Sequence, residues 1–64
     1  MWYFTFGTDN EKKDYIIRIN ESDYYKARER MFELYGGKWC WQYDQQKGEE
    51  LIERYNYKVI EGGI

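Results

Sequence analysis

A single cysteine and no histidine leave this 64-residue chain without the usual cross-links of a very small domain. Cys40 has no second cysteine with which to form a disulfide, and zinc sites are normally built from several cysteine and histidine ligands. A domain of this size buries only about 60% of its unfolded surface, so packing alone gives little stability. We therefore expect one domain over residues 1–64 that gains further stability as a homodimer.

Aromatic side chains make up 22% of the chain, more than so small a core can hide. Tyr and Trp at a surface usually contact a partner, so the composition indicates a binding protein. The net charge of −2 lacks the basic excess of nucleic-acid binders, so nucleic acid is not the expected partner. No apolar run approaches the roughly 20 residues of a membrane span, and the start is not that of a signal peptide. We expect a cytoplasmic protein without membrane contact.

Two segments near the start alternate in the way of strands. Trp2–Phe6 and Tyr15–Ile19 each place apolar residues at every second position. The polar stretch Gly7–Asp14 between them is typical of a loop. The pattern predicts a hairpin.

The clearest helix is predicted over about residues 23–35, with Ser22 as its N-cap and Asp23 in its first turn. Gly36 supplies the stop signal. Apolar and charged residues separate onto opposite sides at helical spacing, as in an amphipathic helix packed on one face of a sheet. The apolar stripe consists of Tyr24, Ala27, Met31, Leu34 and Tyr35.

The segment Lys38–Tyr43 alternates as a strand that places Trp39, Trp41 and Tyr43 on one face. Two interpretations of this face stay open. It is either the core face beneath the first helix or a surface on which bases, nucleotides or a partner protein stack.

The last third of the chain predicts a second short helix and a short strand. Glu49–Tyr55 has helical spacing, although Gly48 weakens its first turn, and residues 57–60 resemble a strand. Gly62 and Gly63 are expected to fray. The order strand-strand-helix-strand-helix-strand predicts an α+β domain with a small, mostly antiparallel sheet.

Several residues of the predicted helix are candidates for contact with a partner. Arg28 falls on the apolar side, where it either reaches a phosphate or carboxylate or lays its stem on apolar surface beside a carboxylate. Tyr25 and Phe32 flank the buried stripe, so they either form a partner surface or widen the core. The predicted partner-binding residues are Tyr25, Arg28, Arg30, Phe32 and Trp41.

A ligand-binding alternative uses a different set of residues. Two helices can leave one sheet face uncovered, and the faces opposite the presumed core carry Tyr3 and Arg18. Such a face would suit nucleic acid or self-association, whereas a nucleotide would need stacking aromatics and cations in a pocket shared between subunits. The residues of this alternative are Tyr3, Arg18, Lys38 and Trp39.

No combination of residues indicates catalysis. The chain has no histidine base for Cys40, which we interpret as a small core residue. The carboxylates of Glu49, Glu50 and Glu53 have the spacing of a solvated helix face. We expect neither an enzyme, nor a cofactor, nor a bound metal.

Three segments carry a resemblance to a known group of proteins: Tyr3–Gly7, Ala27-Arg28 with Met31-Phe32, and Gly37–Tyr43. Over residues 2 to 43 the chain resembles small proteins from phages and prophages of Gram-positive bacteria. The resemblance implies a phage-encoded inhibitor that binds and blocks a bacterial anti-phage defence protein in the host cytoplasm. The alternatives are a sponge that sequesters a nucleotide immune signal and a nucleic-acid-binding accessory protein.

Overall fold

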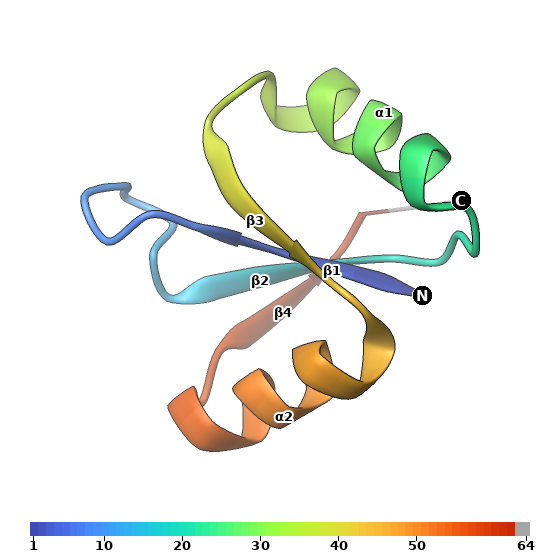
Figure 1. Ribbon diagram of the computed structural model, residues 1–64. Helices are drawn as coiled ribbons and strands as arrows, with labels where there is room; N and C mark the ends of the chain where they lie inside the picture. Colours follow the sequence, from blue (N-terminus) through green and yellow to red (C-terminus); the bar gives the residue numbers. More distant parts are fainter. Residues whose placement is uncertain (63–64) are drawn as a thin grey trace.

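The computed structural model describes residues 1–62 as a four-stranded sheet with one helix on each face (Figure 1). The predicted α+β class and order of elements are confirmed. The predicted main helix over about residues 23–35 is also found, packed on one sheet face. The elements are β1 (Trp2–Phe6), β2 (Tyr15–Ile19), α1 (Tyr24–Tyr35), β3 (Trp39–Tyr43), α2 (Gln45–Tyr55) and β4 (Lys58–Glu61).

The strand order β3-β1-β2-β4 makes the sheet mixed rather than purely antiparallel. β1 runs antiparallel to both β2 and β3, whereas β4 runs parallel to β2. The connection from β2 to β3 through α1 and that from β3 to β4 through α2 cross the sheet in opposite directions. β2, β3 and β4 all run parallel to one another, and crossovers between parallel strands of one sheet are right-handed almost without exception. Two right-handed crossovers in opposite directions place the two helices on opposite faces. The expectation of an uncovered sheet face is therefore wrong.

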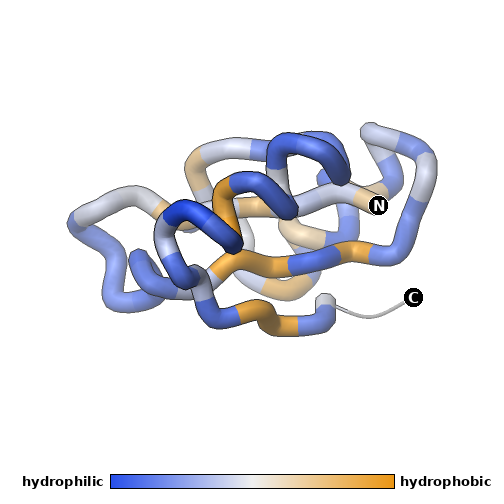
Figure 2. The backbone as a smooth tube through the Cα atoms, turned by 90° about the horizontal axis from the view of Figure 1, so that it is seen from below, coloured by the Kyte–Doolittle hydropathy of each residue, from blue (hydrophilic) through white to orange (hydrophobic). Residues whose placement is uncertain are grey.

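The face beneath α1 holds the main core. The hairpin of β1 and β2 forms with the predicted alternation, so every second residue of both strands points toward this helix. Figure 2 shows hydrophobic segments along the strands and a hydrophilic loop over residues 7–14. The buried residues of this core are Phe4, Phe6, Ile17, Ile19, Ala27 and Met31.

The face beneath α2 holds a second, smaller buried layer. Tyr3 and Ile16 have no exposed surface, and Thr5 is only 5% exposed. Gly48 lies directly on the ring of Tyr3, where an added Cβ would come within 2.2 Å of the ring carbon Cγ. The glycine that weakens the helix in isolation is what allows α2 to approach the sheet.

The helix starts differ from the predicted ones because aspartates cap both helices. Asp23, not Ser22, is the N-cap of α1, and its side chain accepts hydrogen bonds from the backbone N–H groups of Tyr25 and Lys26 at 2.9 and 3.0 Å. Asp44 caps α2 by accepting from the N–H of Lys47 at 2.9 Å, so this helix begins four residues before the predicted start.

Single residues define the C-terminal ends of both helices and the end of β4. Gly36 ends α1 with a φ of 63°, as predicted, and Asn56 ends α2 in the left-handed conformation. Gly62 is buried, and its N–H donates to the carbonyl of Arg18 at 2.8 Å, so the expectation that it frays is wrong. The same expectation for Gly63 lies outside the described residues.

Candidate functional site

β3 is an edge strand whose two tryptophans point to opposite faces of the sheet. Phe6 of β1 pairs with Trp39, but the preceding Thr5 pairs with Trp41, so Cys40 is one extra residue in a β-bulge. Paired residues share a face, which puts Trp39 on the α1 side and Trp41 on the α2 side. The predicted common face of the tryptophans is wrong, because the bulge breaks the period of two.

A groove separates α1 from β3 at this edge of the sheet. It encloses about 420 Å³, and one wall comes from α1 while the other comes from β3 and the turn before it. Cys40 is exposed at this groove, so its interpretation as a core residue is also wrong. The α1–β3 groove is lined by Tyr24, Arg28, Phe32, Gly37, Trp39, Cys40, Trp41 and Gln42.

Arg28 provides the positive charge of the α1–β3 groove. Its guanidinium carbon lies 4.8 Å from the ring centroid of Trp39 and 5.6 Å from that of Tyr24. Its Nη1 donates to the hydroxyl of Tyr24 at 3.3 Å and to Oε1 of Gln42 at 3.4 Å. Within residues 1–62 no carboxylate forms an ion pair with it. The side chain thus rests on aromatic surface, as in the second interpretation of Arg28, but without the neighbouring carboxylate of that interpretation.

Three of the predicted partner-binding residues are large aromatics that lie open to solvent. Tyr25 is 72% exposed, Phe32 51% and Trp41 66%. Phe32 packs edge-to-face on Trp39 with ring centroids 5.4 Å apart, and Tyr25 packs in the same way on Tyr24 at 5.0 Å. Two of these exposed rings are therefore held in place by neighbours that line the groove.

The indole of Trp39 joins the groove to the core. Its ring packs against Phe4 with centroids 5.1 Å apart, which fits the interpretation of this tryptophan as a core residue. Its Nε1–H is buried and has no hydrogen-bond partner within the part of the chain that the structure describes. Unpaired buried donors are uncommon in folded proteins, so this N–H is a further sign of a binding site at the groove.

Arg30, the remaining predicted partner-binding residue, lies away from the α1–β3 groove. Its Nε donates to the carbonyl of Gly62 at 3.0 Å, and its Nη1 lies 3.7 Å from Oε1 of Glu33. The arginine therefore faces the end of β4. Three of the five predicted partner-binding residues, Arg28, Phe32 and Trp41, line the groove, and Tyr25 packs on Tyr24 beside it, whereas Arg30 lies elsewhere.

The residues of the ligand-binding alternative are brought together only in part, since Tyr3 and Arg18 are paired neighbours on β1 and β2. Tyr3 is fully buried beneath α2, and its hydroxyl donates to Oε2 of Glu49 at 3.2 Å. Arg18 is paired with Glu61 of β4. Lys38 lines a separate cavity and Trp39 lines the α1–β3 groove. The four residues therefore do not line one common pocket of a single chain.

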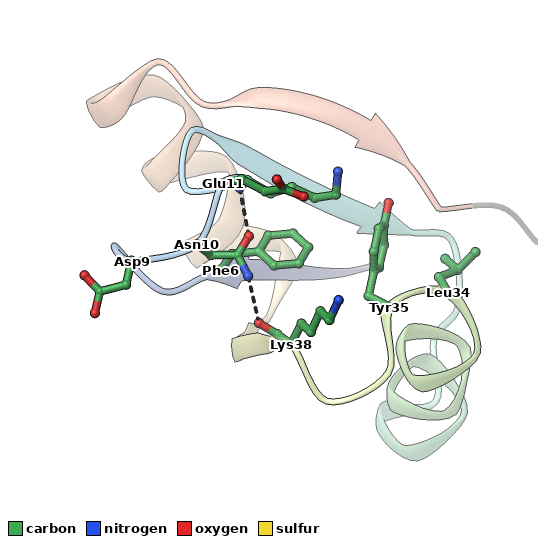
Figure 3. A pocket seen from close by; sticks show the side chains of 8 residues that line it. Phe6, Asp9, Asn10, Glu11, Leu34, Tyr35 and Lys38 are labelled. Carbon is green, nitrogen blue, oxygen red and sulfur yellow. Dashed lines mark hydrogen bonds between the residues drawn. The ribbon is translucent and has the colours of Figure 1, made fainter.

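That separate cavity lies between the loop over residues 7–14 and the end of α1 (Figure 3). It encloses about 640 Å³, and Asn10 bridges its walls by donating to the carbonyl of Lys38 at 3.4 Å and accepting from the N–H of Lys12 at 2.8 Å. Its lining is of mixed charge, because it includes Asp9 and Glu11 as well as Lys12 and Lys38. The two carboxylates disfavour a phosphate-bearing ligand here.

Outside the α1–β3 groove, pKa shifts occur at Tyr3, Tyr57 and Glu61. Burial raises the pKa of the Tyr3 phenol and that of Tyr57. The guanidinium of Arg18 lowers the pKa of the Glu61 carboxyl through their hydrogen bonds.

Over residues 1–62 no three His, Cys, Asp or Glu side chains are placed to hold a metal ion. No helix among these residues is long and apolar enough to cross a membrane.

Tyr24 and Gln42 take part in the groove although neither is among the predicted site residues. Nε2 of Gln42 donates to the carbonyl of Tyr24 at 3.1 Å, which ties β3 to the first turn of α1. Tyr24 belongs to the predicted apolar stripe, so its place beside the sheet could be read from the sequence. The orientation of Gln42 depends on the bulge, for which the sequence carries no distinct signal.

The chain gives no significant match to a protein-family model, to a curated protein or to a solved structure.

Proposed function

We propose that the chain is a protein-binding inhibitor that engages its target through the α1–β3 groove. The observation that carries this proposal is the exposure of three aromatic rings at this edge of the sheet: Phe32 and Trp41 line the groove, and Tyr25 packs on Tyr24, which also lines it. Aromatic residues at the centre of protein interfaces supply most of their binding energy. Exposed rings in such number, in a domain with a complete core, therefore favour a protein partner.

The arrangement of the rings supports binding without large rearrangement. Phe32 and Tyr25 pack edge-to-face on Trp39 and Tyr24, so much of their side-chain entropy is already lost before a partner arrives. The groove also holds Arg28, and arginine is enriched among residues that dominate interfaces. Anchors held in place in this way give affinity to a small surface.

The sequence resemblance gives the proposal its biological form. We infer that the protein is encoded by a phage and that its target is an anti-phage defence protein of the bacterial host. The nucleotide-sponge and nucleic-acid alternatives have less support. The four residues of the first do not line one pocket, and the second would need more cations than Arg28, which among residues 1–62 is the cation that lines the groove.

Phage growth on bacteria that carry single defence systems tests the proposal. Expression of the chain should restore plaque formation against at least one system, and a protein of that system should copurify with the chain in a fixed ratio. The combined variant Tyr25→Ala, Phe32→Ala, Trp41→Ala should lose both effects while remaining folded. If no system is relieved, or if the combined variant is as active as the wild type, the proposal is wrong. A nucleotide recovered without a protein would favour the sponge instead.

A further inference from the structure

The outer edge of β3 is a free template for another strand. β3 ends the sheet order, and within residues 1–62 its only strand neighbour is β1. Unpaired N–H and C=O groups at such an edge readily pair with an extended segment of another protein. Because the bulge falls at Cys40, the regular part of this edge is Trp41–Tyr43. Any added strand is therefore short.

The α1–β3 groove beside this edge lacks the negative charge that its arginine would attract. Among residues 1–62, Arg28 is the one charged residue of the lining, in a chain whose net charge is −2. Its hydrogen bonds go to two neutral oxygens at 3.3 and 3.4 Å, which is long for this donor. A carboxylate would accept two charge-assisted bonds from the same planar group. The site is thus complementary to an acidic side chain.

From these two observations we propose that the α1–β3 groove binds an extended acidic segment of the partner, which adds to the edge of β3 and places a carboxylate on Arg28. The proposal rests on the proposed function only in taking this groove as a protein-binding site. Side chains of a strand alternate between its two faces. One face of the segment therefore meets Phe32 and Arg28, and the other meets Trp41.

A second copy of this chain is a poor occupant of the same site. Two β3 edges paired about a two-fold axis would bring two Arg28 side chains to one interface, and the described residues of neither groove lining include a carboxylate. Like charges in a partly buried interface are repulsive. The occupant is accordingly a different protein with an acidic, strand-forming segment.

Selection from a library of random twelve-residue peptides tests this inference without knowledge of the natural partner. Selected peptides should share one Asp or Glu with apolar residues at alternate positions, and the tightest one should shift the amide resonances of Trp41–Tyr43. Replacing its carboxylate by the amide should weaken binding to the wild type by about tenfold. The same replacement should have little effect on binding to the Arg28→Gln variant.

Four results would overturn the inference. They are a library that yields no binder, peptides without a shared carboxylate, amide shifts that avoid β3, and an equal loss on the Arg28→Gln variant. Methylation of alternate backbone amides adds a test of strand pairing, because binding should be abolished in one register only. Tolerance of both registers would exclude strand addition. If phage growth is restored but the selected peptides carry no shared carboxylate, the proposed function stands and this inference is rejected. If acidic peptides are selected but phage growth is not restored, this inference stands and the proposed function is rejected.

Discussion

Gly48 and Tyr3 show how a single contact decides where a helix can lie. The absence of a side chain at Gly48 lets the first turn of α2 rest on the aromatic ring, and the ring is fully buried as a result. The helix gives up intrinsic propensity at this position and gains the burial of a large aromatic.

The variant Gly48→Ala should be less stable than the wild type. Alanine favours a helix over glycine by about 1 kcal/mol, but its Cβ would lie 2.2 Å from the ring carbon Cγ of Tyr3. Such overpacking costs about 1–3 kcal/mol, so we expect a net loss in the free energy of unfolding by urea. Gly37→Ala is the matched control, since nothing lies within 4 Å of its Cβ position. A gain in stability for Gly48→Ala would contradict the described packing.

The buried phenol of Tyr3 predicts a loss of stability at alkaline pH. Its pKa is raised above the ordinary value of 10.0 in the folded state, chiefly by burial, so folding favours the neutral form. This contribution is complete below about pH 10 and is lost as the pH rises through the raised pKa. Tyr3→Phe should therefore lose less stability than the wild type between about pH 9 and about pH 11, as measured by urea unfolding. Tyr55→Phe, at an exposed position, is the control and should lose as much stability as the wild type. Equal losses for wild type and Tyr3→Phe would refute the prediction.

At the scale of elements, the strands and helices with a regular spacing of apolar residues could be predicted from the sequence. The bulge in β3 and the start of α2, which break that spacing, could not. Both strands of the hairpin and the buried positions Ala27 and Met31 of α1 follow from the spacing of apolar residues, whereas Tyr24 and Leu34 of the predicted stripe are exposed. The bulge at Cys40 depends on how β3 meets β1, a tertiary property that leaves no mark on the alternation of Lys38–Tyr43. The early start of α2 was missed because the cap at Asp44 outweighs the low helix propensity of Gly48.

The candidate site was predicted in part for the same reason. The position of Tyr25 and Phe32 on the flank of α1 follows from helical spacing, and their exposure agrees with it. The exposure of Trp41 follows instead from the bulge and from its place on an edge strand. The burial of Tyr3 depends on the second helix covering the other face, which the predicted elements did not reveal.

The pairing of β4 with β2 should weaken in acid through Glu61. Its pKa is lowered below the ordinary value of 4.5 by Arg18, so the ion pair stabilises the folded state above that pH. The contribution is lost as the pH falls from about 4.5 through the lowered pKa. Between about pH 6 and about pH 3 the variant Glu61→Gln should lose less stability than the wild type. Glu53→Gln is the control on an exposed position, and the same loss in both variants would argue against the pair.

At the scale of the whole molecule, the two helices cover both sheet faces and leave the two sheet edges free. β3 and β4 are these edges. The β3 edge carries Arg28 and the exposed aromatic rings, whereas the β4 edge carries a partly exposed Val59. The division allows one edge to bind a partner while the other pairs with a second copy.

A homodimer through β4 is the expected state in solution. Light scattering should give twice the 8.0 kDa mass of one chain, because pairing of two free edges satisfies their backbone groups. Val59→Lys places a charge on this edge strand and should reduce the mass to that of a single chain. Trp41→Lys on the other edge is the control and should remain dimeric. A wild type with the mass of one chain would contradict the expectation.

The central claim is that the α1–β3 groove is the surface that holds the partner, and the dissociation constants of single variants test it most directly. Calorimetry with the copurified target should show that Trp41→Ala or Phe32→Ala weakens binding by about 30-fold, corresponding to about 2 kcal/mol. Tyr55→Ala, which removes a ring that is 60% exposed beyond the groove, should leave the constant within about twofold. Unchanged affinity for both groove variants, or an equal loss for Tyr55→Ala, would show that the partner binds elsewhere.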